Sequence, residues 1–371
     1  MKIVVLSHPT INSCGVNNVV EEQVRVLRQN HDVVHLKLIY GKSQIKYGDL
    51  NFPKNTVLFN ITRILFPFIN IKRKKLTDRL KECDIIISHS FPMSMIGAQI
   101  NKEHGIPHIY IHHGYCASIL NPLWKMWVEV CKICDKHAFL HTSKVLSVSK
   151  YVQEQLKKQF CQESYVLYNG VDIDKFNPKN RDLEIKEKIG IREDAPFFFS
   201  VGNIMPAKGT EYIIKAFRQY KKIRPDAKLV IAGQIIDKTY FKKCKRLADE
   251  SISFVGFLPS DLLLKFYATA DVFVTGTLWE GFNLPLLEAQ ASGTPVVAFN
   301  HCSHPEVVKN KETGYLTKPL DISDMVKGFE EAYSNSEELS KNAREWAKKF
   351  SLETYAENLN MYIRQALEGG V

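Results

Sequence analysis

Short runs of Val, Ile and Leu recur along the chain, each followed by polar turn residues and then by apolar residues at helical spacing. The runs lie at residues 2–6, 84–89, 106–113, 144–149, 197–202, 228–233, 252–257, 271–276 and 294–299. Short strands rich in β-branched residues that alternate with helices are typical of parallel sheets buried on both faces. The pattern therefore predicts an α/β protein.

The series of strands is interrupted at residues 169–180, which are rich in Asn, Asp, Gly and Pro. Because this composition indicates a connecting segment, we expect two doubly wound, Rossmann-like domains with a cleft between them. The first domain would comprise residues 1–172 and the second residues 190–350, with residues 173–189 as the linker. Apolar residues at helical spacing predict a closing helix over residues 352–371.

Composition narrows the class of protein. The 371 residues are 45% apolar and 24% charged, as in globular chains of two or three domains. The N-terminal apolar run stops at Ser7, and no window approaches the about 18 apolar residues that cross a bilayer, so we expect a cytoplasmic protein. The CxxC pair Cys131 and Cys134 has no second pair, and His112, His113 and Cys116 lack a fourth ligand. We therefore predict no metal and no cofactor.

The net charge of +10 lies entirely in the first half of the chain. Residues 1–170 hold 22 Lys and Arg against 12 Asp and Glu, whereas the other 201 residues hold 28 of each. The excess favours an anionic partner, although a solvated basic surface would have the same composition. Residues 58–75 place nine large apolar residues before four consecutive basic ones. This stretch indicates either an anionic membrane-surface element or a core helix with a solvated end.

Candidate chemistry follows the strands. Gly15 precedes a helix after the first strand, and Lys208 and Gly209 precede another helix at the matching point of the second half. Glycine lets backbone N–H groups approach a phosphate at a helix N-terminus, and lysine can neutralise a diphosphate. A tight turn and a solvated lysine are the alternative interpretation.

Residues 275–289, TGTLWEGFNLPLLEA, carry the strongest signal. Pro285 fits best in a first helical turn, which puts Glu280 on the loop entering a helix and Glu288 one turn inside it. Both carboxylates are acceptors suited to sugar hydroxyls, and the backbone at 281–283 can present N–H groups to an anionic or hydroxyl-rich ligand.

This block, E-x7-E followed by ASGTPVVAF, closely resembles the retaining nucleotide-sugar glycosyltransferases of family 4. The resemblance extends to SCGVNNVVEEQVRVL, HHGY, VSKYVQEQL, YNGVDIDKF, VGNIMPAKG and PEVVKNKETGYL. It implies the GT-B fold, in which two Rossmann-like domains face across a cleft and the C-terminal helix returns to the first domain. It also implies transfer of a sugar from a UDP-, GDP- or ADP-sugar to an acceptor hydroxyl with retention at the anomeric carbon.

The resemblance assigns roles by position. His113, with His112 as the alternative in a shifted register, matches a histidine near the reacting sugar, and Glu280 the carboxylate near the donor sugar. Glu288 matches the ribose-binding carboxylate. The remaining substrate-binding candidates are Gly15, Asn203, Lys208, Gly281, Phe282 and Asn283. Asn203 stands where the family usually has Arg, which leaves Lys208 to carry more of the diphosphate charge.

Several alternatives remain open. A phosphorylase or epimerase would share the fold, and a catalytically weak homologue would only bind nucleotide. A nucleic-acid-binding protein would need aromatic residues interleaved with a basic stripe, which the clusters lack. We expect a glycan or lipid-linked acceptor, with peripheral attachment to the cytosolic face of an anionic membrane, and no nucleic acid.

Overall fold

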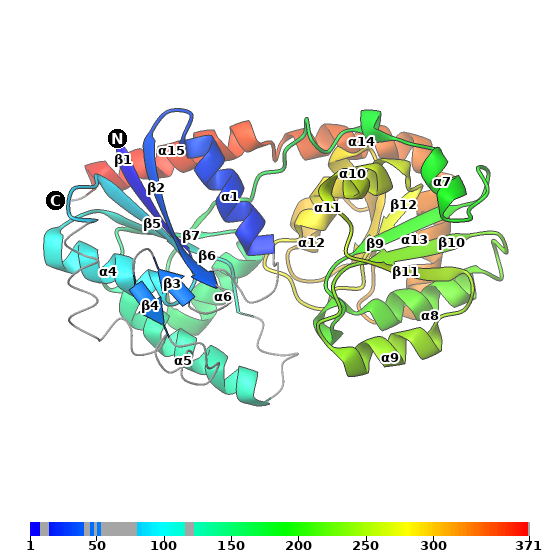
Figure 1. The fold of residues 1–371 in the computed structure, drawn as a ribbon, viewed down its shortest axis with the longest axis horizontal. Helices are drawn as coiled ribbons and strands as arrows, with labels where there is room; N and C mark the ends of the chain where they lie inside the picture. The colour runs from blue at the N-terminus through cyan, green and yellow to red at the C-terminus, as the bar shows by residue number, and fades with distance from the viewer. Residues whose placement is uncertain (8–14, 41–44, 48–49, 53–79, 116–121, 370–371) are drawn as a thin grey trace. The chain divides into compact units, whose positions relative to one another are not determined.

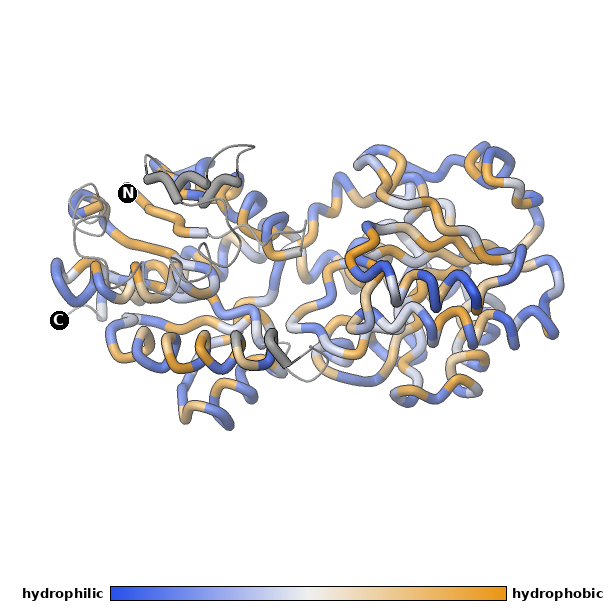
Figure 2. Tube along the Cα trace, turned by 60° about the horizontal axis from the view of Figure 1, so that its bottom comes forward, coloured by the Kyte–Doolittle hydropathy of each residue, from blue (hydrophilic) through white to orange (hydrophobic). Residues whose placement is uncertain are grey.

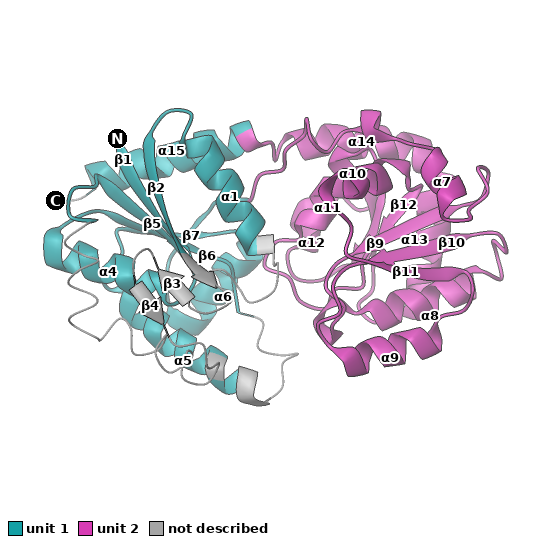
Figure 3. Cartoon of the chain, in the orientation of Figure 1, with its two compact units in different colours: residues 1–168, 353–371 teal, residues 169–352 magenta. Residues whose placement is uncertain are grey.

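The structure is a computed structural model that describes residues 1–7, 15–40, 45–47, 50–52, 80–115 and 122–369. The chain divides into two compact units, shown in separate colours in Figure 3. Unit 1 consists of residues 1–168 and 353–371, and unit 2 of residues 169–352. Unit 1 is therefore discontinuous, because the whole of unit 2 is inserted between its two parts.

Unit 1 is built on one sheet with strand order β4-β3-β2-β1-β5-β6-β7-β8. Strands β3 and β4 run antiparallel at one edge, and the other strands pair in parallel (Figure 1). Their bounds are β1 (Lys2–Ser7), β2 (Asp32–Tyr40), β3 (Ile45–Tyr47), β4 (Leu50–Phe52), β5 (Ile85–His89), β6 (His108–His112), β7 (Lys144–Ser147) and β8 (Tyr165–Val166).

Helices cover both faces of this sheet (Figure 1). They are α1 (Gly15–Leu27), α4 (Met93–His104), α5 (Pro122–Phe139), α6 (Lys150–Phe160) and α15 (Leu352–Glu368). The C-terminal helix α15 packs on unit 1, where Asn360 is hydrogen-bonded to His31 and Tyr362 donates to Val166 O. Cys131 and Cys134 lie buried in an apolar cluster between α4 and α5, where they pack as small apolar residues.

Unit 2 contains a parallel sheet in the order β11-β10-β9-β12-β13-β14. The strands are β9 (Phe197–Val201), β10 (Lys228–Ala232), β11 (Ile252–Gly256), β12 (Val272–Val274), β13 (Val296–Phe299) and β14 (Gly314–Thr317). This is the doubly wound order of dinucleotide-binding domains, with the first and fourth strands side by side. The prediction of two doubly wound α/β units is confirmed.

The helices of unit 2 are held by caps and by a two-sided core. They are α7 (Glu184–Lys188), α8 (Thr210–Tyr220), α9 (Lys238–Leu247), α10 (Ser260–Thr269), α11 (Leu284–Ala291), α12 (His304–Val307), α13 (Ile322–Ser334) and α14 (Ser336–Lys348), with 3-10 helices η2 (Pro178–Asn180) and η3 (Pro206–Lys208). The side chains of Asp237 and Asp321 accept from backbone N–H groups in the first turns of α9 and α13.

Alternation along β9 shows how the sheet of unit 2 is buried. Phe198 packs with residues of α8, α9 and α13, whereas Phe197 and Phe199 pack on Phe266 of α10. Both faces of the strand are therefore apolar. In Figure 2, hydrophobic residues, in orange, recur along the central extended segments of the chain. The predicted runs do not include β2, whose apolar residues alternate with His35 and Lys37, nor the short strands β3, β4, β8 and β14.

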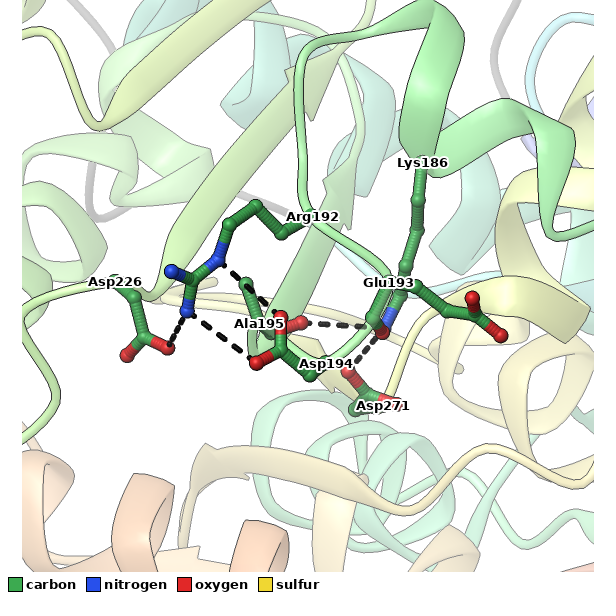
Figure 4. A network of polar contacts seen from close by, with 7 residues as sticks. All are labelled: Lys186, Arg192, Glu193, Asp194, Ala195, Asp226 and Asp271. Atoms are coloured by element: carbon green, nitrogen blue, oxygen red, sulfur yellow. Dashed lines mark hydrogen bonds and ion pairs between the residues drawn. The ribbon is translucent and has the colours of Figure 1, made fainter.

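Residues 173–189, expected to link the domains, fall inside unit 2. Lys186 of α7 is 4% exposed, and its Nζ donates to the carbonyl oxygens of Glu193 and Ala195 and to Asp271 Oδ2, at 3.0, 3.1 and 3.2 Å (Figure 4). A buried ammonium is tolerated only when it is fully paired. Lys186 thus links α7 to the residues that precede strands β9 and β12.

The sequence raised two questions about membranes: whether the chain crosses one, and whether residues 58–75 rest on one. In the described ranges, no helix is long and apolar enough to cross a membrane. Residues 58–75, the candidate membrane-surface element, lie outside the described residues.

Candidate active site

The site in unit 2 lies at the carboxyl edge of the sheet, where β9 and β12 are neighbours. After β9 the chain continues toward the edge of the sheet formed by β10 and β11. After β12 it continues toward the opposite edge, formed by β13 and β14. Ligands of open α/β sheets bind at such a switch point. The loops after β9 and β12 carry Lys208 and Glu280.

The two loops touch through their main chains. A Cβ atom built on Gly209 would lie 1.9 Å from the carbonyl oxygen of Gly276, and one built on Gly276 would lie 2.5 Å from the carbonyl oxygen of Gly209. Both distances are impossible for real atoms, so only glycine fits at either position. A hydrogen bond of 2.9 Å from Leu278 N to Ala207 O joins the same loops.

The contact brings together two residues that the sequence analysis had selected separately. Nζ of Lys208 donates to Oε2 of Glu280 in a short ion pair. Lys208 ends η3 and Glu280 lies on the loop before α11. The side chains are 31% and 21% exposed, so the pair is half-buried and open to a ligand.

Glu288 lies one turn inside α11, and Pro285 lies in the first turn of that helix, both as predicted. The hydroxyl of Tyr267, which is fully buried on α10, donates to Glu288 Oε2 at 2.7 Å. Burial raises the pKa of Glu288, and the hydrogen bond from Tyr267 and the charge of Lys175 oppose that rise. The carboxylate is therefore held in a partly desolvated position with one partner.

A buried histidine orders the segment between the two glutamates. His304 Nδ1 lies 2.8 Å from the carbonyl oxygen of Phe299, so it carries the proton and leaves Nε2 to accept from Asn283 Nδ2 at 3.0 Å. Burial lowers the pKa of His304 to about 4. Ser303 Oγ also donates to Glu280 O at 3.3 Å. The sequence analysis missed His304, which begins the short helix α12 five residues after the end of β13.

Three further candidates from the sequence are Gly281, Phe282 and Asn203. Phe282 is 7% exposed and its ring lies against Phe350, so Gly281 and Phe282 can meet a ligand through the main chain. Asn203 lies on the loop after β9, which is hydrogen-bonded to the loop after β10. Within the described ranges, Asn203 is not hydrogen-bonded to Lys208 or Glu280.

In unit 1, His113 directly follows β6, and its Nε2 lies 2.9 Å from Nδ1 of His89, the last residue of β5. His112 is buried in the interior of unit 1. Its side chain is 2% exposed, and its Nδ1 accepts a hydrogen bond from Gly114 N at 2.9 Å. Burial lowers the pKa of His113 to about 4 and that of His112 to about 3, so both are neutral near pH 7. Gly15 begins α1, while the loop before it lies outside the described residues.

No group of three or more His, Cys, Asp and Glu side chains in the described part of the chain is arranged to hold a metal ion. The polar groups gathered at the two sheet edges are instead a lysine, carboxylates, neutral imidazoles and backbone N–H groups. In unit 2, the lysine, the carboxylates and the backbone N–H groups suit an anionic ligand that also carries hydroxyl groups.

Two family models match the chain. The model described as "Glycosyltransferase Family 4" matches residues 14–175, and the model described as "Glycosyl transferases group 1" matches residues 182–350. An uncharacterized glycosyltransferase of Methanocaldococcus jannaschii is 25% identical over 353 residues, covering 92% of this chain and 89% of that protein.

Further similarities point in the same direction. A UDP-Gal:alpha-D-GlcNAc-diphosphoundecaprenol alpha-1,3-galactosyltransferase of Escherichia coli is 28% identical, covering 66% of this chain and 64% of that protein. The structure of Anabaena HepE in complex with UDP and glucose has a TM-score of 0.76 at 17% identity, covering 98% of this chain and 100% of the other. Sucrose-phosphate synthase from Thermosynechococcus elongatus has a TM-score of 0.79 at 18% identity, covering 98% of both chains. These structures show a shared fold.

The main-chain contact at the switch point predicts a difference between two glycine substitutions. Gly209 and Gly256 both have left-handed φ angles, +58° and +71°, but a Cβ on Gly256 meets no atom within 4 Å. Gly256→Ala should cost only the left-handed strain, about 1–2 kcal/mol, whereas Gly209→Ala should lose about 1–3 kcal/mol more because the loops must separate. Urea unfolding of both variants measures the difference, and equal losses would contradict the contact.

Proposed function

The chain belongs to the family 4 glycosyltransferases with the GT-B fold, and on that basis we propose that it moves a sugar from a nucleoside-diphosphate sugar to an acceptor hydroxyl with retention of anomeric configuration. The observation that carries this assignment is the Lys208–Glu280 pair at the switch point of unit 2. The pair sets a cation beside a carboxylate that can accept hydrogen bonds from hydroxyl groups. A sugar diphosphate calls for both, the cation for its phosphates and the carboxylate for its hydroxyls.

The diphosphate would bind beside Lys208. As the bond to the sugar breaks, negative charge grows on the leaving diphosphate, and fixed cations and N–H groups stabilise that charge. Lys208 supplies the cation, and the main chain at 281–283, before the N-terminus of α11, supplies donors. Because Asn203 brings no charge, Lys208 bears this task on the loop after β9.

The two glutamates would hold the sugars of the donor. Glu288, kept in place by Tyr267, accepts from ribose hydroxyls, and Glu280 accepts from hydroxyls of the transferred sugar. Each carboxylate already has a partner that fixes its position, Tyr267 and Lys208 respectively. We therefore assign them binding roles, and we propose that the acceptor hydroxyl attacks from the same face that the diphosphate leaves. His113, neutral at pH 7, would contact the reacting sugar.

The acceptor we propose is a glycan carried on a lipid. The Escherichia coli relative is named for a diphosphoundecaprenol-linked acceptor, and a relative in Corynebacterium glutamicum is named for a phosphatidylinositol monomannoside. The charge of residues 1–170 fits the anionic headgroups that surround such acceptors.

Unit 1 offers a surface for an anionic bilayer. Met126, Ile133 and Leu140, spaced seven residues apart along and just after α5, are 63%, 72% and 73% exposed. A spacing of seven keeps side chains on one side of a helix. The exposed Lys125 and Lys136 flank this α5 stripe. Apolar side chains bordered by lysines suit the interface of an anionic membrane, on which we propose that the enzyme rests peripherally.

The diphosphate role of Lys208 can be separated from the sugar role of Glu280. Lys208→Met should weaken binding of the preferred nucleotide among UDP, GDP and ADP by about 10- to 100-fold, because a charge-assisted bond is lost. Lys215→Met, on the exposed side of α8, should leave it unchanged. Isothermal titration calorimetry provides the measurement.

Glu280→Gln should leave nucleotide affinity intact but reduce sugar transfer by about 10-fold or more, because its hydroxyl contact weakens. Loss of nucleotide binding in Glu280→Gln, or normal binding in Lys208→Met, would contradict these assignments.

The environment of Glu288 predicts a pH effect. The ionised carboxylate accepts ribose hydroxyls best, so nucleotide affinity should be present above the pKa of Glu288 and lost as the pH falls through it. Tyr267→Phe removes the hydrogen bond that lowers this pKa. The acid limb of nucleotide affinity should therefore move to higher pH in Tyr267→Phe, as measured by titration calorimetry across pH. An unmoved limb would show that Glu288 does not bind the ribose.

Flotation with vesicles tests the membrane proposal. The protein should float with phosphatidylglycerol vesicles at low salt and detach at high salt, because screening removes the attraction to the headgroups. Ile133→Asn should reduce flotation, whereas Ile223→Asn, 51% exposed in unit 2, should not. Absence of flotation at low salt would remove the membrane from the proposal.

A further inference from the structure

Four side chains of unit 1 form a continuous hydrogen-bonded row that ends at His113. His113 Nε2 lies 2.9 Å from His89 Nδ1, and His89 Nε2 lies 2.7 Å from Gln23 Oε1. Gln23 Nε2 in turn donates to the hydroxyl of Tyr355 at 2.9 Å. We call these four residues the histidine relay. Its members come from α15, α1, the end of β5 and the residue after β6.

The row fixes where each imidazole carries its proton. The amide of Gln23 is oriented with Nε2 donating to Tyr355, so its carbonyl oxygen faces His89 and can only accept, and in this orientation His89 holds its proton on Nε2. Burial lowers the pKa of His89 well below its usual value, so the ring is neutral and its Nδ1 is a lone-pair acceptor. The bond between the two histidines then requires a proton on Nε2 of His113, which leaves the lone pair of His113 on Nδ1.

Because three of the four side chains are buried, water does not compete for the hydrogen bonds between them. Gln23 is 0% exposed, His89 1% and Tyr355 4%, whereas His113 is partly exposed at the carboxyl edge of the sheet. Among the described residues, none hydrogen-bonds Nδ1 of His113. The relay therefore runs from the buried side chains of Tyr355, Gln23 and His89 to the partly exposed His113.

We propose that Gln23 and His89 are positioning residues that make His113 a hydrogen-bond acceptor toward the substrate. Through Nδ1, His113 would accept from a hydroxyl of the transferred sugar, and it would not donate to the diphosphate. This inference rests on the proposed function, which places His113 beside the reacting sugar. It adds the kind of group that His113 recognises and the residues that determine it.

The tautomer itself can be measured without any substrate. In protein labelled with 15N-histidine, the chemical shifts of the two ring nitrogens separate a protonated nitrogen from one with a lone pair. The signals of His113 are identified by their loss in His113→Phe. We expect a proton on Nε2 and a lone pair on Nδ1. A proton on Nδ1 would mean that the relay runs in the opposite direction, and it would overturn the proposal.

Gln23→Met tests whether the relay acts on the reaction. Without the amide oxygen, His89 can take either tautomer, so the His113 signals should shift away from the single Nε2–H form. We expect kcat of sugar transfer to fall by about 10-fold or more, while nucleotide affinity, which depends on unit 2, stays unchanged.

Ser88→Ala is the matched control. Ser88 precedes His89 on β5, faces the other side of the sheet and hydrogen-bonds the buried His108 at 2.7 Å. This variant removes a comparable buried bond to a histidine, but it should leave both the His113 spectrum and kcat as in the wild type.

The outcomes separate this inference from the function on which it rests. A fall in kcat in Gln23→Met with unchanged His113 shifts would reveal a merely structural role and overturn the positioning role. Full transfer activity in His113→Phe would overturn the contact between His113 and the sugar, whatever the spectrum shows. Altered shifts together with reduced kcat in Gln23→Met, but not in Ser88→Ala, would support the relay.

Discussion

The main-chain contact between Gly209 and Gly276 is the constraint on which the site in unit 2 depends. The chain leaves β9 and β12 toward opposite sides of the sheet, so nothing in the topology alone requires their first loops to meet. They meet because neither residue has a Cβ, and the contact sets the origins of the Lys208 and Glu280 side chains at a fixed separation. A cation and a carboxylate thus hold each other at the point where parallel sheets receive ligands.

Much of this arrangement was accessible from the sequence because it is local. The apolar runs located the strands that frame both sites, and Pro285 was enough to place Glu280 before α11 and Glu288 one turn inside it. Lys208 was recognised by its position before a helix. What no local pattern contains is the pairing of Lys208 with Glu280, 72 residues apart, which arises only when β9 and β12 become neighbours.

The residues that support the candidates were the ones missed, and for the same reason. Tyr267, His304, Gln23 and Tyr355 each lie in an ordinary helical stretch, and their importance comes from a partner brought in by folding. Phe282 shows the opposite case: it belongs to the recognised motif, yet its ring lies in the core. The sequence thus identified where the chemistry lies better than it identified what holds that chemistry in place.

The insertion of unit 2 into unit 1 has a consequence for how the protein is made. Unit 2 is one uninterrupted segment, whereas unit 1 needs α15, which is synthesised after the whole of unit 2. Domains generally fold as units while the chain emerges. Here unit 2 can complete its fold first. Unit 1 cannot complete its fold until α15 has been synthesised and packs on it. The hydrogen bond between Tyr355 and Gln23, and with it the region around His89, can therefore form only after the whole of unit 2 has been synthesised.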